Sequence, residues 1–268
     1  MAGVWAACWR VYRQRFVPWI ALNMLRERRT LRIVHPETDR LAPNAIINST
    51  LFKLFQQLSV KGPKIGSRKL KDDDGSIALV ASEGMFKALG FTLSLDPSLV
   101  SGAGIGVFVK AGRVSQGEVV CMYAGTVYEP GEPVLLQSLG NRYLFRCIDG
   151  LLIDGKAKGL SRLIYRSCSG RDWLGPHPLS DTTWLSADRL NPAAVGQYVN
   201  NCCPDRPANV AYQEFDVPLD FPLALRRFLP NVPYTSQPGR LLRCMVLIAL
   251  RDIEKGEELY SNYFTVIT

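Results

Sequence analysis

The first third of the chain shows the spacing of hydrophobic positions that is typical of helices. From Asn44 to Leu58 apolar residues recur every three or four positions, which predicts a core-facing helix with Asn44 as its cap. The stretch SIALVASEGMFKALG predicts a second helix that ends at Gly90. A glycine-, lysine- and aspartate-rich stretch near 61–75 predicts a solvated linker between them. We therefore expect a helical N-terminal extension over residues 1–98.

After Pro97 the pattern changes to short β-branched and aromatic runs bounded by glycines. The runs are GVFVKAG, VVCMYAGTVY, RYLFRCIDGLLIDG, NVAYQEFDV and LLRCMVLIALRDI. Asp149 and Gly150 fit a two-residue hairpin turn between two of these strands. Many short strands with few intervening helices argue against a doubly wound nucleotide-binding fold. They predict a mostly β domain over 99–268, with insertions near 156–196 and 216–242.

The composition limits the chemistry that the chain can perform. Lysine and arginine number 32 against 24 acidic residues, which gives a formal charge of +8 and fits acidic partners. Seven cysteines without a Cys-x-x-Cys pair, and only two histidines, predict reduced thiols and no metal site. No apolar run reaches the roughly 20 residues of a membrane span. We expect an intracellular protein without a transmembrane segment.

The first 34 residues are rich in arginine, and on a helix their aromatic residues would share one face. A mitochondrial presequence and a basic helix packed on the rest of the protein fit this segment equally well. The compartment is therefore open between nucleus, cytosol and mitochondrion. Nucleic-acid binding is the least favoured use of this segment, because the arginines are confined to it and no reader motif follows. The sequence does not indicate an oligomeric state.

Three separated stretches are candidates for a functional site. In SGAGIGVFVKAG, Gly104 and Gly106 either form a turn into an edge strand or let a ligand approach the backbone. In YVNNCC, Asn200 and Asn201 offer donors and acceptors that suit a purine, or they satisfy a local turn. In GEELYSNYF, Tyr263 either points its hydroxyl into a cleft or is an ordinary half-buried tyrosine. Each stretch alone leaves both alternatives open.

In this order the three stretches resemble the blocks of the SET-domain protein methyltransferases. The opening block is GIGVFVKAGRVSQGEVVCMYAG, the central block is QYVNNCC followed by PAN, and the closing block is IEKGEELYSNYF. The resemblance covers about residues 99–268. It implies a mostly β (α+β) fold of the SET type, with small β-sheets around a central turn and a helical N-terminal extension.

The resemblance also implies a cofactor, a substrate and roles for individual residues. The cofactor would be S-adenosyl-L-methionine, and the substrate would be a protein that accepts the methyl group on a neutral lysine amine in an aromatic channel. Tyr263 and Tyr123 would be the catalytic residues. The cofactor-binding residues would be Gly104, Ile105, Gly106, Asn200, Asn201 and Tyr263. Asn209 would match the asparagine that ends the central block.

The chain departs from the family pattern at several positions. Gln197 stands where the family has arginine, Asn201 where it has histidine, and Cys202 where it has serine. No cysteine-rich zinc segment follows the closing block, so we expect the proline-rich insertion after Phe215 to close the substrate channel. The alternative function is a catalytically inactive SET-like module that serves as a binding scaffold.

Overall fold

The computed structural model describes most of the chain after the arginine-rich segment. The described residues are 32–34, 40–61, 74–237, 239–263 and 265–267. The arginine-rich segment before Arg32 and most of the predicted linker lie outside these ranges. No helix within the described ranges is both long and apolar enough to cross a membrane.

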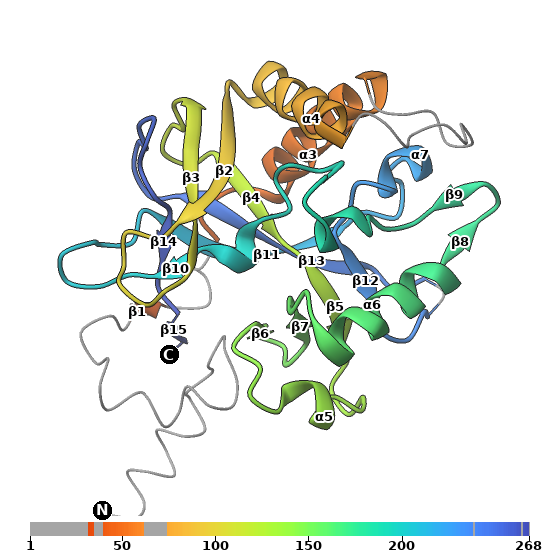
Figure 1. The fold of residues 1–268 in the computed structure, drawn as a ribbon. Coiled ribbons are helices and arrows are strands. Elements are labelled where there is room, and N and C mark those ends of the chain that lie inside the picture. The colour runs from red at the N-terminus through yellow and green to blue at the C-terminus, as the bar shows by residue number, and fades with distance from the viewer. Residues whose placement is uncertain (1–31, 35–39, 62–73, 238, 264, 268) are drawn as a thin grey trace, which may run out of the picture.

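The two predicted helices are α3 (Asn44–Lys61) and α4 (Asp74–Leu89). They pack on each other and lie at the top of Figure 1. The apolar positions of α3 are buried, as its spacing predicts: Ile47, Leu51, Leu54, Phe55 and Leu58. Helix α3 starts at Asn44 itself, and the Pro43 carbonyl accepts the N–H of the third and fourth helical residues. Helix α4 ends before Gly90, which takes a positive φ of 82°. Both predicted helices are confirmed.

A two-stranded ribbon follows α4 directly. Strand β2 (Phe91–Pro97) pairs antiparallel with β3 (Ile105–Gly112). Gly112 closes the ribbon where a Cβ would lie 2.0 Å from the carbonyl oxygen of Gly90, so only glycine fits there. The strand-rich part of the structure therefore begins at Phe91, inside the region predicted as a helical extension.

Two sheets form the centre of the molecule (Figure 1). The first is antiparallel, in the order β11 (Val210–Val217), β13 (Leu242–Ala249) and β4 (Val119–Tyr123). The second has the order β12 (Asn231–Pro233), β5 (Gly125–Tyr128), β7 (Leu152–Asp154) and β6 (Leu144–Arg146). Only Ala124 separates β4 from β5, so the chain passes between the sheets immediately after Tyr123.

Smaller pairs of strands complete the sheet topology. Strand β8 (Trp173–Leu174) pairs with β9 (His177–Pro178), β10 (Asn200–Asn201) with β14 (Tyr260–Ser261), and β1 (Arg32–Val34) with β15 (Thr265–Ile267). The molecule is thus a mixed fold made mostly of small sheets with helices at its N-terminal side. This confirms the predicted fold class.

The hairpin between β6 and β7 is confirmed, but the prediction of a two-residue turn is wrong. The N–H of Gly150 donates to the Cys147 carbonyl at 3.1 Å, and the N–H of Cys147 donates to the Leu151 carbonyl at 2.8 Å. Gly150 has a φ of 94°, while no non-glycine residue in the described chain has a positive φ. A type I′ turn would need positive φ at Asp149 as well. The loop is therefore longer and closes on a single glycine.

The two predicted insertions contain short elements. The first holds α6 (Gly159–Arg171), the 3₁₀ helix η3 (Thr183–Leu185) and the 3₁₀ helix η4 (Gly196–Tyr198). The second holds α7 (Leu223–Arg226) and β12. Phe221 of the second insertion packs edge-on against Phe55 of α3, with ring centroids 6.1 Å apart. Phe228 packs against the same ring in a tilted arrangement, with centroids 5.6 Å apart. This insertion ties α3 to β5, and its role in closing a substrate channel stays a prediction.

Candidate functional site

The pairing of β10 with β14 brings the central and closing blocks together. The two strands are parallel, with Asn200 opposite Tyr260 and Asn201 opposite Ser261. The N–H of Cys202 extends this pairing by donating to the Ser261 carbonyl at 2.8 Å. Figure 1 shows β10 and β14 beside the β2–β3 ribbon. The pairing therefore brings two segments that lie 60 positions apart in the chain into one site.

Asn209 fixes the closing block from the other side. Its side-chain Nδ2 donates to the Glu258 carbonyl at 2.8 Å, and its Oδ1 accepts the N–H of Tyr260 at 2.8 Å. Its own N–H donates to the Tyr260 carbonyl at 2.9 Å. The side chain is buried, and its amide bonds the backbone of Glu258 and Tyr260 as a neighbouring strand would. Asn209 therefore holds the backbone of the site, and its described contacts are all within the protein.

Glu258 lies at the centre of the site, although the sequence analysis gave it no role. Its side chain is only 2% exposed. Its carboxylate accepts hydrogen bonds from Ser98 Oγ at 2.7 Å, Leu99 N–H at 2.8 Å, Asn200 Nδ2 at 3.1 Å and Tyr260 Oη at 2.5 Å. Burial disfavours the charge of this carboxylate, but the four donors outweigh burial and lower its pKa. A stable anion thus holds three separate segments together.

The sequence did contain a signal for part of this arrangement. Glu258 and Tyr260 are two positions apart, so in an extended chain they point to the same side. Burial and the nearby carboxylate raise the pKa of Tyr260 to about 12, which keeps its hydroxyl protonated as the donor. Ser98 and Leu99 offered no signal, because they lie about 160 residues earlier and meet Glu258 only in the folded chain.

The Gly-x-Gly turn lies directly against this anion. A Cβ on Gly106 would lie 2.1 Å from Glu258 Oε1, so the carboxylate occupies the space that a side chain would need. Asn200 Nδ2 donates to the carbonyl of Ile105 at 3.1 Å. Gly104 has a φ of 80° and open space where its Cβ would be. The structure thus brings together four of the predicted cofactor-binding residues around Glu258.

Tyr263 bonds two residues of the central block. Its N–H donates to Asn201 Oδ1 at 2.9 Å, and its hydroxyl donates to the carbonyl of Val199 at 2.8 Å. The side chain of Asn201 therefore positions the tyrosine that follows β14. The two residues lie together, and their roles in cofactor binding and catalysis stay predictions.

Tyr123 is fully buried beside the same region. Its hydroxyl donates to the Tyr143 carbonyl at 2.8 Å, and its ring packs at 5.6 Å from Phe145 and 6.1 Å from Tyr212. Burial raises its pKa well above the ordinary value, followed by the charges of Tyr212 and Tyr263. Tyr123, Phe145 and Tyr212 form what we call the aromatic cluster, and Tyr263 lies close enough to Tyr123 to contribute to its pKa increase.

Two of the residues that depart from the family pattern, Gln197 and Cys202, are buried. Gln197 accepts the N–H of Ala124 at 3.4 Å and donates to the Ala194 carbonyl at 3.3 Å. Gln197 thus contacts the residue between β4 and β5, immediately after Tyr123. Its amide supports the backbone next to the aromatic cluster.

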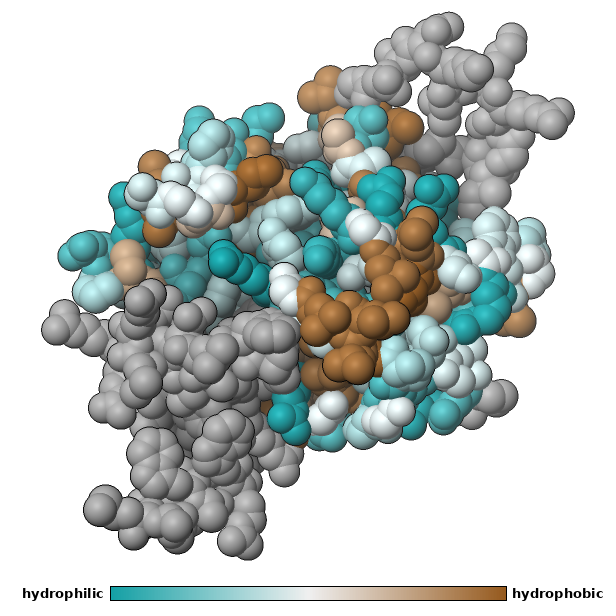
Figure 2. Space-filling view, turned by 60° about the horizontal axis from the view of Figure 1, so that its bottom comes forward, coloured by the Kyte–Doolittle hydropathy of each residue, from teal (hydrophilic) through white to brown (hydrophobic). Residues whose placement is uncertain are grey.

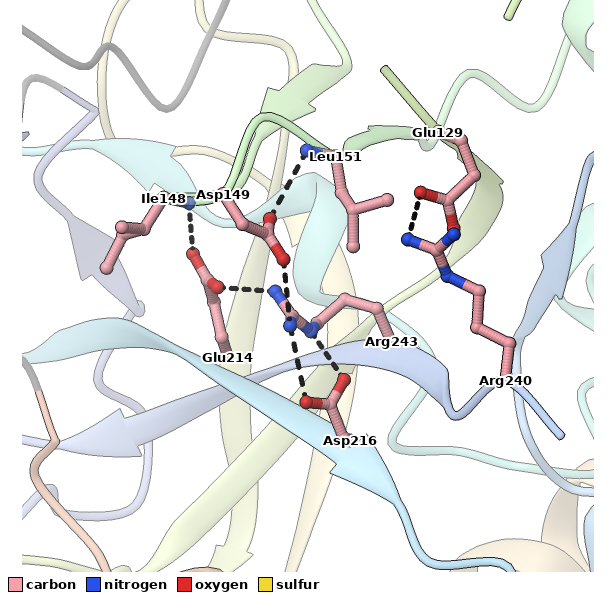
Figure 3. A network of polar contacts seen from close by, with 8 residues as sticks. All are labelled: Glu129, Ile148, Asp149, Leu151, Glu214, Asp216, Arg240 and Arg243. Atoms are coloured by element: carbon pink, nitrogen blue, oxygen red, sulfur yellow. Dashed lines mark hydrogen bonds and ion pairs between the residues drawn. The ribbon is translucent and has the colours of Figure 1, made fainter.

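A second polar cluster lies at the β6–β7 hairpin and the strands β11 and β13 (Figure 3). Cys147, Asp149 and Glu214 bring three possible metal ligands within 4.8 Å of one another. The guanidinium of Arg243, however, contacts Glu214 at 2.6 Å, Asp216 at 2.7 Å and Asp149 at 3.1 Å. A protein cation already neutralises these acids, so the cluster connects the β6–β7 hairpin to β11 and β13.

Comparison with known proteins defines the class to which the fold and site belong. No family model matches the chain. The human protein named SET domain-containing protein 9 is 46% identical over 295 aligned positions, which cover 100% of this chain and 98% of that protein. The Pongo abelii protein of the same name is 56% identical over 266 positions, covering 89% of this chain and 97% of that one. The chain is therefore a SET-domain protein. It belongs to the SET domain-containing protein 9 family.

Solved structures resemble part of the chain. One is ctPRC2 in an autoinhibited conformation bound to S-adenosylmethionine, at 16% identity and a TM-score of 0.33, matched over 65% of this chain. Another is a humanized mutant of the Chaetomium thermophilum Polycomb Repressive Complex 2 bound to the inhibitor GSK343, at 16% identity and a TM-score of 0.36 over 70% of this chain. The matches span only 15% and 16% of those longer chains.

Proposed function

We propose that this protein transfers a methyl group from S-adenosyl-L-methionine to a protein, with the side-chain amine of lysine as the acceptor. The β10–β14 pairing carries the proposal, because it places Asn200, the Gly-x-Gly turn and Tyr263 in one region. Membership of the SET-domain proteins supports the same reaction class.

The residues around Gly104 fit the proposed cofactor. Gly104 leaves open space, and Ile105 beside it is 50% exposed, which offers an apolar surface next to accessible backbone. Asn200 makes its two hydrogen bonds from Nδ2, which leaves Oδ1 as an acceptor for a donor such as the adenine amino group. Asn201 would contribute its backbone. When bound, the cofactor supplies an electrophilic methyl group on a positively charged sulfur.

The aromatic cluster would receive and orient the amine. A free lysine amine has a pKa of about 10.4, so most of it is protonated at neutral pH and cannot attack. Desolvation among Tyr123, Phe145 and Tyr212 lowers that pKa and favours the neutral nucleophile. Because in-line displacement needs alignment more than proton transfer, exclusion of water and a fixed approach are the main contributions of these residues.

The two catalytic tyrosines would position the amine rather than remove its proton. Each hydroxyl donates its hydrogen to a backbone carbonyl, at Tyr143 for Tyr123 and at Val199 for Tyr263. Each oxygen can therefore only accept from the amine. The raised pKa of Tyr123 also keeps it a neutral phenol.

An inactive scaffold is the second candidate function. The observation that favours it is the hydrogen bond from the N–H of Tyr263 to Asn201 Oδ1. This bond uses the side chain of Asn201 within the protein, at a position where the SET-domain pattern has histidine. A scaffold would keep the fold without binding the methyl donor. Cofactor binding separates the two functions.

The first experiment is calorimetric titration of the full chain with S-adenosyl-L-methionine, together with Asn200→Ala. We expect saturable binding that weakens at least about tenfold in the variant, a change of about 1.4 kcal/mol. Lack of binding by a folded wild-type sample would favour the scaffold. In Tyr263→Phe, methyl incorporation into a lysine-rich protein mixture should fall by a larger factor than cofactor affinity. Tyr234→Phe is the matched control. Equal loss of both would contradict the role of Tyr263.

A further inference from the structure

The short helix α5 (Leu135–Ser138) has its polar and apolar sides reversed. Its buried side chain is Gln137, which donates to the Pro133 carbonyl at 3.0 Å and to the Tyr128 hydroxyl at 3.5 Å. Leu135 and Leu136, in contrast, are 72% and 68% exposed. A helix at the surface of a globular protein normally buries its leucines and exposes its amides. The exposed leucines of α5 therefore have a role outside the packed core.

Helix α6 shows the same reversal in its first turns. Ser161 is buried, whereas Leu160 and Leu163 are exposed, Leu163 to 65%. Lower in the helix, Tyr165 and Cys168 are buried in the ordinary way. Only the start of α6, which lies nearest in sequence to α5, presents leucines to solvent.

A buried carboxylate lies between the two helices. Asn141, just after α5, donates from Nδ2 to Asp154 Oδ1 at 2.7 Å and also to the Gln137 carbonyl at 3.0 Å. Burial raises the pKa of Asp154, and the nearby side chains of Ser161 in α6 and Asn141 partly offset the increase. Asp154 thus holds the loop after α5 and lies near the first turn of α6.

Exposed leucines from both helices form what we call the leucine surface. Figure 2, in which the lower end of Figure 1 comes forward, shows hydrophobic side chains gathered in one broad patch on this face. The members of the leucine surface are Leu135, Leu136, Leu139, Leu160 and Leu163. Contiguous exposed apolar patches of this kind mark interaction sites more often than scattered single leucines do.

The charges around the leucine surface are mainly positive. Between residues 132 and 170 the bases are Arg142, Arg146, Lys156, Lys158, Arg162 and Arg166, while the acids are Glu132, Asp149 and Asp154. The carboxylate of Glu132 accepts the N–H of Glu129. Asp154 is buried and Asp149 contacts Arg243. Arg166 follows Leu163 by three positions and so lies beside it on the helix surface. The apolar patch is therefore flanked by cations.

We infer that the leucine surface binds an acidic amphipathic helix of a partner protein. Such a helix would place its apolar residues on the leucines and its carboxylates opposite Arg166 and Lys158. An anionic membrane is less favoured, because membrane-surface helices present one long apolar face, whereas this surface is divided between a four-residue helix and the start of another. The inference does not depend on methyl transfer.

The test uses the full chain and three fluorescent peptides of about 18 residues, long enough to form a helix. The first carries leucines at helical spacing with glutamates beside them, the second has lysines in place of the glutamates, and the third has serines in place of the leucines. Fluorescence anisotropy should show saturable binding of the glutamate peptide alone. Binding should weaken at least tenfold in the double variant Leu136→Ser, Leu163→Ser, and should stay unchanged in the control Leu219→Ser.

A charge exchange tests the second half of the inference. Arg166→Glu should weaken binding of the glutamate peptide and strengthen binding of the lysine peptide. Added salt should weaken binding of the glutamate peptide to the wild-type protein. Binding of all three peptides alike, absence of binding, or an unchanged double variant would overturn the inference. So would tight binding to phosphatidylserine vesicles without peptide binding. Dimers that the double variant dissociates would also overturn it, because a second copy would then occupy the surface.

Discussion

Glu258 and Asp181 are carboxyl groups with the same exposed fraction, 2%, yet their environments push their pKa values in opposite directions. Glu258 accepts four hydrogen bonds that come from three distant segments. Asp181 accepts from the N–H and hydroxyl of Thr183 through Oδ1, and its Oδ2 has no hydrogen-bond partner within the described chain. The backbone of Asn191 and the charge of Arg189 also act to lower its pKa. Burial dominates at Asp181 and raises its pKa to about 6.

This difference separates a residue that assembles the candidate site from one that lies in a local turn. At Glu258 the donors lie far away in sequence, so the charge is stabilised only once the site is folded. At Asp181 the two donors to Oδ1 belong to a residue two positions later, so this part of its stabilisation is local. The ability of a buried carboxylate to stay ionised therefore depends on the number and geometry of its donors as well as on its depth.

The largest effect is expected at Glu258. Glu258→Ala leaves the donors of Ser98, Leu99, Asn200 and Tyr260 without their acceptor, so we expect a loss of about 4 kcal/mol in the free energy of unfolding. Urea denaturation measures the loss. The control is Glu257→Ala next to it, whose carboxylate pairs with the half-exposed Arg251 and should cost less than about 1 kcal/mol. Similar losses in both variants would mean that Glu258 does not assemble the site.

Arg243 tests the same principle with a cation in place of neutral donors. Arg243→Met leaves Glu214, Asp216 and Asp149 close together without their shared partner, so we expect about 3 kcal/mol of destabilisation. The matched control is Arg240→Met, because Arg240 is half exposed and pairs only with Glu129 in Figure 3. A loss in Arg243→Met no larger than in the control would show that the acids tolerate one another in solvent.

The two glycines beside Glu258 should respond differently to alanine. Gly106→Ala forces the carboxylate aside, and we expect about 2 kcal/mol of destabilisation together with weaker cofactor binding. Gly104→Ala meets open space and only the strain of a positive φ, which costs about 1 kcal/mol. Thermal unfolding and cofactor titration of the two variants measure the contrast. The reverse order of stability would indicate that Glu258 moves freely and does not fill the space at Gly106.

The sequence predicted the parts of this fold that depend on local patterns. Helical spacing located α3 and α4, and glycine-bounded apolar runs located the strands of the two sheets except β12, because these signals require only neighbouring residues. Strand β12 lies in the stretch predicted as a proline-rich insertion. The three blocks also predicted which segments would meet at the site. Which stretch each segment pairs with was not predictable from periodicity alone.

Long-range contacts and reversed patterns account for most of what the sequence did not predict. The bond from Ser98 to Glu258 joins residues that share no local pattern. Gln137 was unpredictable as a buried residue because its helix exposes its leucines instead. At Asp149 and Gly150 the residue types fitted a tight turn, but hydrogen bonds at Cys147 select a longer loop. In each case tertiary contacts override local preference.

Asp181 offers the smallest and most specific test of the comparison. Its pKa is about 6 in the folded protein and close to 3.9 when unfolded, so between these values the folded state binds the proton more tightly. Protonation therefore favours folding as the pH falls through 6, and this contribution is lost as the pH rises again. From pH 7 to pH 5 it amounts to about 1 kcal/mol. Other groups titrate as well, so the quantity to follow is the difference between wild type and Asp181→Asn.

The asparagine variant retains an acceptor for Thr183 but cannot ionise, which makes it the matched control for charge. Urea denaturation of both proteins at several pH values should show the wild type gaining stability relative to Asp181→Asn as the pH falls from 7 to 5. Asp205→Asn, at an exposed carboxyl, should show no such relative change. A constant difference between wild type and Asp181→Asn would mean that a donor reaches Oδ2 and keeps Asp181 ionised, in which case its environment would resemble that of Glu258.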